Sequence, residues 1–450
     1  MVMQSDQGIT VLDSTKSVCP VCLNIVEAAI VVQENAVYLK KRCPEHGEVV
    51  TYLWPDVEHY RWMSGLKLPY IRPKLQVDTA RGCPRDCGLC KAHLRHSTLV
   101  EIEVTERCNL RCPVCFMAAE AAPAALKPHS GIENQDPGIE ALEAKYRAVL
   151  EKTGPQTSIQ ITGGEPTVRQ DLPEIVRLGL SMGFTAIEIN TNGVVIANDY
   201  VFLDKLVQAG ASGIYLQFDG LTPEVYRKIR GQNLLPIKLK AIENCRQAGI
   251  QVVLAMTVIE GINHDQMGRV LDFALLNKDV IAGLAYQPAF GSGRFDVVTS
   301  KRLGMGDVIF MLAEQSQGLL KPYDFWPLGC SHPLCSSATY LLDYQGKIEP
   351  LTRKLTIEEY IAEFDPQSPQ GSVLGDIAYK KYPDLKSGLS IVIMNYMDAF
   401  TMDLKRLREC SMTVLDKDDG IVPFCSYQLT NTSGQKRDEL LTNLRGNYHV

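Results

Sequence analysis

Three cysteines, Cys108, Cys112 and Cys115, stand in the segment VEIEVTERCNLRCPVCF at the spacing C-x3-C-x2-C. Thiolates this close together on a loop can bind an iron-sulfur cube, which takes four ligands when it only carries electrons. Three ligands leave one iron open, and an open coordination site is typical of catalytic metals. A structural zinc loop is the alternative, although zinc knuckles favour paired C-x2-C units. The spacing therefore predicts a catalytic [4Fe-4S] cluster.

A second motif, ITGGEP from Ile161 to Pro166, follows one predicted strand later. Its glycines, Gly163 and Gly164, let the backbone approach a ligand closely. Glu165 then supplies a carboxylate that can accept a hydrogen bond from an ammonium group. The two motifs together predict a ligand with an amino group beside the open iron.

Short apolar stretches alternate with amphipathic helical patterns over roughly two hundred residues in the middle of the chain. This alternation predicts an α/β fold whose parallel sheet is covered by helices, and its six repeats predict an incomplete barrel. The predicted strands cover residues 100–105, 158–162, 186–190, 213–218, 252–258 and 284–288.

The triplet and the GGEP motif, placed on successive strands, resemble the radical SAM superfamily over roughly residues 98–290. The resemblance implies a partial (β/α)6 barrel. It also implies an enzyme that reductively cleaves S-adenosylmethionine at its cluster to a 5'-deoxyadenosyl radical, which abstracts hydrogen from an unactivated carbon. An electron donor such as ferredoxin or flavodoxin is expected as a partner.

The resemblance further implies roles for individual residues. The three cysteines match the cluster ligands, Val114 matches the position that packs on adenine, and the GGE residues match the loop that meets the methionine amino group. Other cofactor-binding candidates lie at the carboxyl ends of strands, where barrel sites form, or on the following helix. They are Asn190, Asn192, Gln217, Asp219 and Arg227, with Arg230, Thr257 and Gln287 in comparable positions. Turns or helix caps are the alternative roles for Asn192 and Asp219, since each precedes a glycine.

The chain holds 14 cysteines, and most of the others also form groups. Cys83, Cys87 and Cys90 repeat the C-x3-C-x2-C spacing without a following GGEP, so they predict an auxiliary cluster that takes a fourth ligand from elsewhere. Cys245 fits a small buried helical residue. The late cysteines predict a second auxiliary cluster, a ligand for the first one, or a zinc site: Cys330, Cys335, Cys410 and Cys425.

Near the N-terminus, Cys19-Pro-Val-Cys22 and Cys43-Pro-Glu-His46 flank an alternating apolar stretch. Three thiolates and one imidazole suit a tetrahedral site for zinc or a single iron. So few residues cannot bury enough apolar surface unaided, and the metal is expected to supply the missing stability. The expected inventory is therefore a catalytic cluster, one or two auxiliary [4Fe-4S] clusters and one mononuclear iron or zinc.

Four segments are predicted from these groups. Residues 1–65 form a rubredoxin-like or zinc-ribbon-like metal module, residues 66–97 an auxiliary cluster segment, and residues 98–300 the radical SAM core. Residues 301–450 form a C-terminal module with auxiliary cluster ligands, including an apolar, Met-rich helix at 389–407.

The composition of the 450 residues excludes several classes of protein. Hydrophobic residues make up 45% and charged residues 22%, and no apolar run is long enough to cross a bilayer. A net charge of −6 with interspersed signs gives no field for nucleic acid. The N-terminal sequence lacks the pattern of a signal peptide, so the cytoplasm is the expected location.

The order of the cysteine groups is similar to that of the tetraether lipid synthase and 7,8-dihydro-6-hydroxymethylpterin dimethyltransferase-like group. For the lipid synthases, this resemblance implies carbon-carbon bond formation on a lipid chain, and we take that as the leading prediction. The Met-rich stretch 391–402 would then line an apolar tunnel, with peripheral contact at a membrane, although an apolar stripe of this kind is more often part of the core. His46 departs from the four cysteines of a rubredoxin-like site, which puts mononuclear iron in doubt.

Radical methylation of a pterin or another small molecule is the alternative, and it would need a polar pocket instead. Two further hypotheses come from other classes: an iron-sulfur protein that only transfers electrons, and a metal-stabilised scaffold. Formation of 5'-deoxyadenosine and the metal content of the protein separate these three classes.

Overall fold

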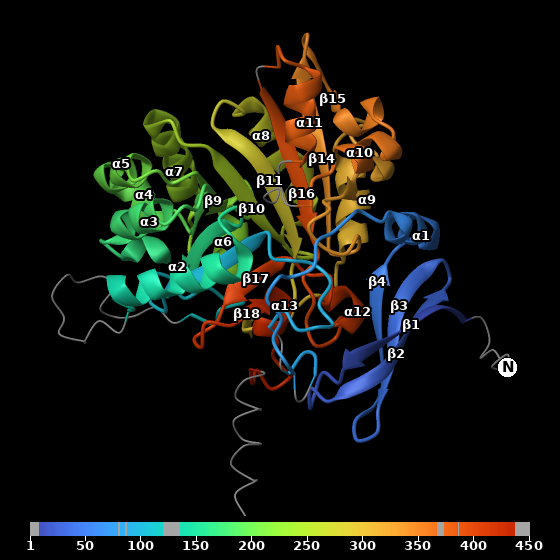
Figure 1. The fold of residues 1–450 in the computed structure, drawn as a ribbon. Coiled ribbons are helices and arrows are strands. Elements are labelled where there is room, and N and C mark those ends of the chain that lie inside the picture. The colour runs from blue at the N-terminus through green and yellow to red at the C-terminus, as the bar shows by residue number, and fades with distance from the viewer. Residues whose placement is uncertain are drawn as a thin grey trace, which may run out of the picture.

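The computed structural model describes two main sheets, a small one at the N-terminus and a large one that forms the body (Figure 1). The small sheet has four strands, and the large one has 12. The described residues are 9–79, 82–85, 88–119, 136–366, 373–385 and 387–436.

The N-terminal sheet is antiparallel and is followed by helix α1 (Val57–Gly65). Ile30, Leu39 and Trp54 on its inner face belong to the same hydrophobic cluster as the core of the body. The sheet is therefore packed onto the body through a shared core. Its strands, in spatial order, are β1 (Thr10–Val18), β2 (Ile25–Gln33), β3 (Ala36–Cys43) and β4 (Gly47–Trp54).

Six parallel strands follow one another in the large sheet in the order of the chain. They are β5 (Leu99–Thr105), β7 (Ser158–Gly163), β8 (Ile187–Thr191), β9 (Gly213–Gln217), β10 (Val252–Val258) and β11 (Ile281–Pro288). All six predicted strands are confirmed, and no strand end differs from its predicted position by more than three residues. The predicted α/β fold with a partial barrel is confirmed as well, since further strands continue the sheet at both of its edges.

Helices between the strands cover the outer face of this sheet (Figure 1). Parallel neighbours need such crossovers because a tight turn cannot join them. The covering helices are α2 (Ile139–Thr153), α3 (Leu172–Ser181), α4 (Val194–Asn198), α5 (Tyr200–Gln208), α7 (Leu235–Ala248), α8 (Met267–Leu276) and α9 (Met305–Gln315). Helix α6 (Pro223–Arg230) instead packs on the loop after β5, where Tyr226 shares a cluster with Cys108 and Leu110.

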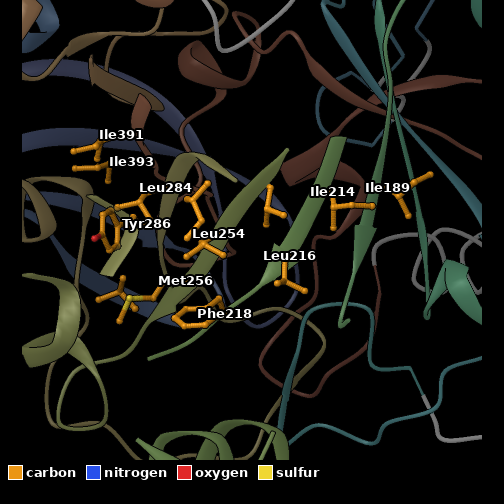
Figure 2. Close-up of a cluster of buried hydrophobic side chains, with 14 of the residues drawn as sticks. Ile189, Ile214, Leu216, Phe218, Leu254, Met256, Leu284, Tyr286, Ile391 and Ile393 are labelled. Carbon is orange, nitrogen blue, oxygen red and sulfur yellow. The ribbon is translucent and has the colours of Figure 1, made fainter. Parts of the chain in front are cut away.

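The strands direct alternate side chains to opposite faces, as the pleat of a strand requires. On β9, Ile214 and Leu216 pack in the core, whereas Tyr215 and Gln217 line an inner cavity. Figure 2 shows the core-facing set on neighbouring strands, from Ile189 on β8 to Ile391 and Ile393 beyond β11. The outer face is thus apolar, and the inner face is free to carry polar groups.

The chain after residue 301 extends the same sheet at both edges. Strand β16 (Ser387–Met394) pairs in parallel with β11, and β14 (Ser336–Tyr344) pairs antiparallel with β16. At the other edge β17 (Met412–Leu415) pairs in parallel with β5. The remaining elements are short: β6 (Val114–Cys115), β12 (Arg294–Phe295), β13 (Trp326–Pro327), β15 (Lys347–Pro350), β18 (Ile421–Pro423), α10 (Ile357–Glu363), α11 (Val373–Lys381), α12 (Leu404–Leu407) and α13 (Phe424–Tyr427).

The predicted helix at 389–407 is wrong, because its first part is strand β16 and only α12 is helical. Leu389, Ile391 and Ile393 face the core, while Val392 and Met394 line the cavity. Both faces of this strand are covered, so its apolar run resembles a buried helix in sequence. Among the described helices, none is long and apolar enough to span a membrane.

Lys41 connects the N-terminal sheet to the C-terminal part of the chain. Its buried ammonium group donates to the Ser17 hydroxyl at 3.1 Å and to the carbonyl oxygens of Ala399 at 2.7 Å and Phe400 at 2.9 Å. Burial lowers the pKa of Lys41 to about 8.

The Lys41→Met substitution should destabilise the protein by about 1 to 3 kcal/mol, because two carbonyl groups lose their buried donor. Thermal unfolding measures this change. Lys40→Met is the matched control, since Lys40 points to the other face of β3 and makes an exposed ion pair with Glu48 at 3.2 Å. Equal losses of stability in the two variants would contradict the assigned role of Lys41.

Candidate active site

Cys108, Cys112 and Cys115 line a cavity of about 780 Å³ whose walls extend along the inner face of the barrel. The loop that carries them leaves the carboxyl end of β5 and ends in β6, which pairs with β12 through Cys115 and Arg294. Arg294 also donates to the carbonyl oxygens of Cys112 and Ala119, each at 2.7 Å. The three predicted cluster ligands are therefore held on the wall of one cavity.

The surroundings of Cys108 and Cys112 oppose ionisation of their thiols unless a cation is present. Burial raises the pKa of Cys108 to about 12 and also raises the pKa of Cys112, while the guanidinium of Arg230 acts in the opposite direction on Cys112. A metal binds thiolates and would supply the missing positive charge. Three thiols on the wall of one cavity, one of them buried and two partly buried, with an arginine beside them, therefore fit a [4Fe-4S] cluster.

The GGEP loop packs directly on the backbone that precedes the triplet. A Cβ atom on Gly163 would collide with the carbonyl oxygen of Thr105, and one on Gly164 would collide with that of Arg107. Gly163 also has a φ of 137°, which favours glycine. The amides of Gly164 and Glu165 donate to these same two carbonyl oxygens, each at 2.8 Å. The glycines thus join the two motifs, in addition to lining the cavity.

Glu165 is buried and joins the ends of β7 and β8. Its carboxylate accepts from the Thr191 hydroxyl at 2.6 Å, from the Asn192 amide at 2.6 Å and from the Thr167 hydroxyl at 2.5 Å. Asn192 in turn donates from its side chain to Asn109 of the triplet loop at 2.7 Å. Burial raises the pKa of Glu165, and these donors oppose that effect. The carboxylate is therefore fixed in orientation at the cavity wall.

Asp219 lies behind the cavity, where it pairs with Arg230. Arg230 Nε lies 2.7 Å from Asp219 Oδ2, and Arg230 Nη2 lies 2.9 Å from Asp219 Oδ1. Arg230 lines the cavity and also donates to the carbonyl oxygen of Val114 at 2.9 Å and to the Thr257 hydroxyl at 3.2 Å. Asp219 therefore acts through Arg230, which holds the triplet loop against β10.

The structure does not bring Arg227 into the site. Its side chain is half exposed and pairs with Glu224 on the same helix at 2.9 Å. Arg230 lies four residues after the buried Tyr226 and therefore shares its inward face, whereas Arg227 does not. That helical spacing is the signal in the sequence that separates the two arginines.

The other predicted cofactor-binding residues all line the cavity: Val114, Asn190, Asn192, Gln217, Thr257 and Gln287. Lys238 had no motif to identify it, yet it is fully buried and donates to the Asn192 carbonyl and to Gln217 Oε1, the latter at 2.7 Å. Burial lowers the pKa of Lys238 to about 7.

Further lining residues lie deeper in the barrel than the strand ends: Glu101, Gln160, Glu188 and Tyr215. These side chains lie toward the amino ends of their strands, outside the positions where barrel sites are usually sought. The alternation of buried apolar and inward polar residues along each strand is the signal that could have identified them.

The N-terminal metal centre consists of Cys19, Cys22, Cys43 and His46, whose ligand atoms all lie within 4.8 Å of one another. Cys22 Sγ and Cys43 Sγ are 3.9 Å apart, and His46 Nδ1 lies 3.6 Å from Cys19 Sγ and 3.5 Å from Cys43 Sγ. Tetrahedral zinc requires about 3.8 Å between two thiolates and about 3.6 Å between thiolate and imidazole. The hydrogen bond from His46 lowers the pKa of Cys43 to about 6. The predicted four-ligand site is therefore assembled.

The late cysteines gather in the C-terminal segment. Desolvation raises the pKa of the partly buried Cys410 thiol, and the neighbouring thiols of Cys425, Cys335 and Cys330 raise it further. The guanidinium of Arg406 donates to Cys335 Sγ from two nitrogens, at 3.3 and 3.4 Å. Buried thiols beside an arginine repeat the pattern of the catalytic triplet.

Cys83 packs against the same apolar cluster as Cys410 and Cys425. The Ser426 hydroxyl donates to the carbonyl oxygen of Pro84 at 3.1 Å, which brings the two segments together. Cys87 lies outside the described residues, and Cys90 is partly buried. Which of these cysteines share a cluster stays a prediction.

The Arg230→Met substitution should cost about 3 to 5 kcal/mol of stability, because it leaves the carboxylate of Asp219 buried without its partner. Thermal unfolding and iron content after reconstitution measure the effect. Arg227→Met is the matched control and should change stability by less than about 0.5 kcal/mol. The double variant Asp219→Asn/Arg230→Met should recover part of the loss. No difference between the two single variants would contradict the assignment.

The N-terminal site should keep its metal when the catalytic cluster cannot form. In a Cys108→Ala/Cys112→Ala/Cys115→Ala variant we expect about one equivalent of zinc, because three cysteines and one histidine form a common structural zinc site. In Cys22→Ser/Cys43→Ser the zinc should be lost. Elemental analysis of both proteins decides this, and iron in place of zinc in the first would contradict it.

Parts of the chain are similar to known protein families and to individual proteins. Residues 102–274 match the Radical SAM superfamily, and residues 11–55 match the HMPTM N-terminal zinc ribbon domain. A probable GTP 3',8-cyclase of Methanothermobacter marburgensis is 30% identical over 40% of this chain and 55% of its own length. Among solved structures, Streptococcus suis SuiB bound to precursor peptide SuiA aligns with a TM-score of 0.40 at 18% identity, covering 50% of this chain and 46% of that chain.

One relative matches almost the whole chain. The 7,8-dihydro-6-hydroxymethylpterin dimethyltransferase of Methanocaldococcus jannaschii is 34% identical over an alignment of 481 positions, gaps included, that covers 92% of this chain and 92% of the relative. Such a match spans the metal ribbon, the barrel and the C-terminal segment. The chain is therefore a radical SAM enzyme that uses a [4Fe-4S] cluster and S-adenosylmethionine, and it belongs to the radical SAM superfamily in the family of this pterin dimethyltransferase.

Proposed function

We propose that the protein is a radical SAM methyltransferase that acts on a pterin or a closely related polar heterocycle. The observation that carries this proposal is the 34% identity with a pterin dimethyltransferase over 92% of both chains. When bound, the cluster and S-adenosylmethionine supply the means to abstract hydrogen from an unactivated carbon. This function is the alternative that the sequence left open beside lipid coupling.

Different residues of the cavity would bind the cluster and S-adenosylmethionine. Cys108, Cys112 and Cys115 bind the cluster. Glu165, fixed by its hydrogen bonds to β8, accepts from the amino group of S-adenosylmethionine. Val114 packs on the adenine and is held by the bond from Arg230 to its carbonyl oxygen.

The polar groups of the deeper cavity favour a heterocycle over an alkyl chain. Gln160 donates to Glu188 at 2.7 Å, and Gln287 donates to the Tyr215 hydroxyl at 2.8 Å. Burying carboxylates and amides against hydrocarbon costs free energy, because they give up hydrogen bonds to water and gain none in return. A ring with its own donors and acceptors replaces the lost water.

An aromatic wall on one side of the cavity fits a planar ring as well. Tyr396, Phe290 and Phe424 contact one another: the ring centroid of Tyr396 is 5.3 Å from that of Phe290 and 4.6 Å from that of Phe424, and the two phenylalanine centroids are 6.2 Å apart. All three rings line the cavity, and Phe116 stacks on Phe290 at 6.1 Å beside the triplet loop. Stacking on such a wall orients a flat substrate without requiring charge.

Carbon-carbon coupling of lipid chains has less support. Val392, Met394 and Tyr396 from the stretch predicted to line a tunnel do line the cavity. The same cavity, however, is lined by the buried carboxylate of Glu101 and the partly buried carboxylate of Glu188. Contact with a membrane, the external electron donor and the cytoplasmic location stay predictions.

The late cysteines are proposed to hold auxiliary [4Fe-4S] iron. Cys335, Cys410 and Cys425 influence one another electrostatically, and Cys83 packs beside them. Arg406 compensates the charge of Cys335 in the way that Arg230 compensates that of Cys112.

The Cys112→Ala variant should form neither 5'-deoxyadenosine nor methylated pterin, because two thiolates do not hold the catalytic cluster. The assay uses anaerobically reconstituted protein, a chemical reductant, S-adenosylmethionine and 7,8-dihydro-6-hydroxymethylpterin, with products identified by mass spectrometry. Cys245→Ala is the matched control, since Cys245 is buried in α7 away from the cavity lining and should keep both activities.

Wild-type protein that forms 5'-deoxyadenosine but methylates no pterin would contradict the proposed substrate class. Wild-type protein with full iron content that forms no 5'-deoxyadenosine would contradict the assignment of the catalytic triplet.

A further inference from the structure

Glu101 is a buried carboxylate on the cavity wall, and one of its oxygens has no hydrogen-bond partner among the described residues. Its side chain is 2% exposed, and its Oε2 atom accepts no hydrogen bond from the part of the chain that the structure describes. Burial raises the pKa of Glu101 to about 8, and the neighbouring Glu103 raises it further. A carboxylate in this state is unfavourable unless a ligand supplies donors.

The nearest polar residues are already engaged with one another. Glu101, Gln160 and Glu188 lie side by side on β5, β7 and β8, in register. Gln160 donates its amide to Glu188 at 2.7 Å, on the side away from Glu101. Glu103 accepts from the Tyr427 hydroxyl at 3.0 Å through Oε2, and its Oε1 is also without a hydrogen bond among the described residues, but Glu103 does not line the cavity. Glu101 therefore combines a place on the cavity wall with a buried oxygen that the described residues leave unpaired.

The position of Glu101 sets the distance at which a ligand could be held. Glu101 lies four positions before Thr105, a distance of about 13 Å along the strand. The carbonyl oxygen of Thr105 contacts the GGEP loop. Tyr396 of the aromatic wall is close enough for Glu101 to influence its hydroxyl electrostatically. A flat bicyclic ring can therefore stack on this wall with one edge at Glu101 and the other toward the catalytic triplet.

We propose that Glu101 binds two adjacent N–H donors of the substrate, namely the ring N–H and the exocyclic amine of a 2-amino-4-oxopyrimidine ring. This inference rests on the proposed function and adds the residue that recognises the substrate. A carboxylate accepts two parallel N–H bonds from such an edge, as it does from a guanidinium group. The contact fixes which carbon of the ring system faces the cluster end of the cavity.

The test compares Glu101→Gln with wild type in the full-length reconstituted protein. Calorimetric titration measures the affinity for 7,8-dihydro-6-hydroxymethylpterin and for its analogue with oxygen in place of the 2-amino group. Glu101→Gln should weaken pterin binding about 10- to 100-fold, the usual worth of charged hydrogen bonds. Wild type should discriminate against the analogue by a similar factor, and Glu101→Gln should discriminate far less.

Two controls separate recognition from structure. Glu174→Gln changes an exposed glutamate on α3 and should leave binding unchanged. Glu101→Gln should keep the iron content, the 5'-deoxyadenosine formed without substrate, and a melting temperature no lower than that of wild type, since it removes an unpaired buried carboxylate. Glu101→Asp, which keeps the charge, should retain part of the discrimination.

The outcomes distinguish failure of the inference from failure of the proposed function. Wild-type affinity or undiminished discrimination in Glu101→Gln would overturn the role of Glu101 alone. A large loss of stability in that variant would also overturn it, because Glu101 would then have a structural partner. Wild-type protein that binds neither pterin nor its analogue would overturn the proposed function, and the inference with it.

Discussion

The buried ion pair between Asp219 and Arg230 holds the site together. Arg230 reaches from α6 to the carbonyl oxygen of Val114 in the triplet loop and to Thr257 on β10, so one side chain joins three elements. Its charge is tolerable only because Asp219 compensates it, and the carboxylate equally depends on the arginine. The loop that carries the three cysteines is thereby fixed to the barrel by a pair of charges, and loss of either charge leaves the other buried without compensation.

Sequence patterns predict the frame of this protein well and its deeper chemistry poorly. The barrel strands were predicted from short apolar stretches, and the metal site was predicted from the spacing of Cys19, Cys22, Cys43 and His46. Both patterns can be read directly from the sequence, without knowledge of the tertiary contacts. Strand β16 was mistaken for a helix because both of its faces are buried, which removes the usual alternation. Glu101 and Lys238 are absent from any motif because their importance comes from burial, which only the packed barrel reveals.

The N-terminal metal module is integrated into the body of the protein. Besides the shared core and Lys41, the Asn431 side chain donates to the Val21 carbonyl at 3.0 Å, and the Thr432 amide donates to the Pro20 carbonyl at 2.9 Å. These hydrogen bonds connect the turn that carries Cys19 and Cys22 to the segment that follows Cys425. Metal binding at the ribbon is therefore expected to stabilise the segment after Cys425 as well as the ribbon itself.

The two edges of the parallel barrel are both extended by one stretch of chain. Strand β16 adds to the β11 edge and β17 adds to the β5 edge, so residues 395–411 cross from one side of the opening to the other. Tyr396 in this crossing and Met412 just after it line the cavity. Insertions or deletions in the crossing would resize the substrate space while leaving the triplet and the GGEP loop untouched. Related enzymes could thus evolve new substrate ranges on an unchanged radical-generating core.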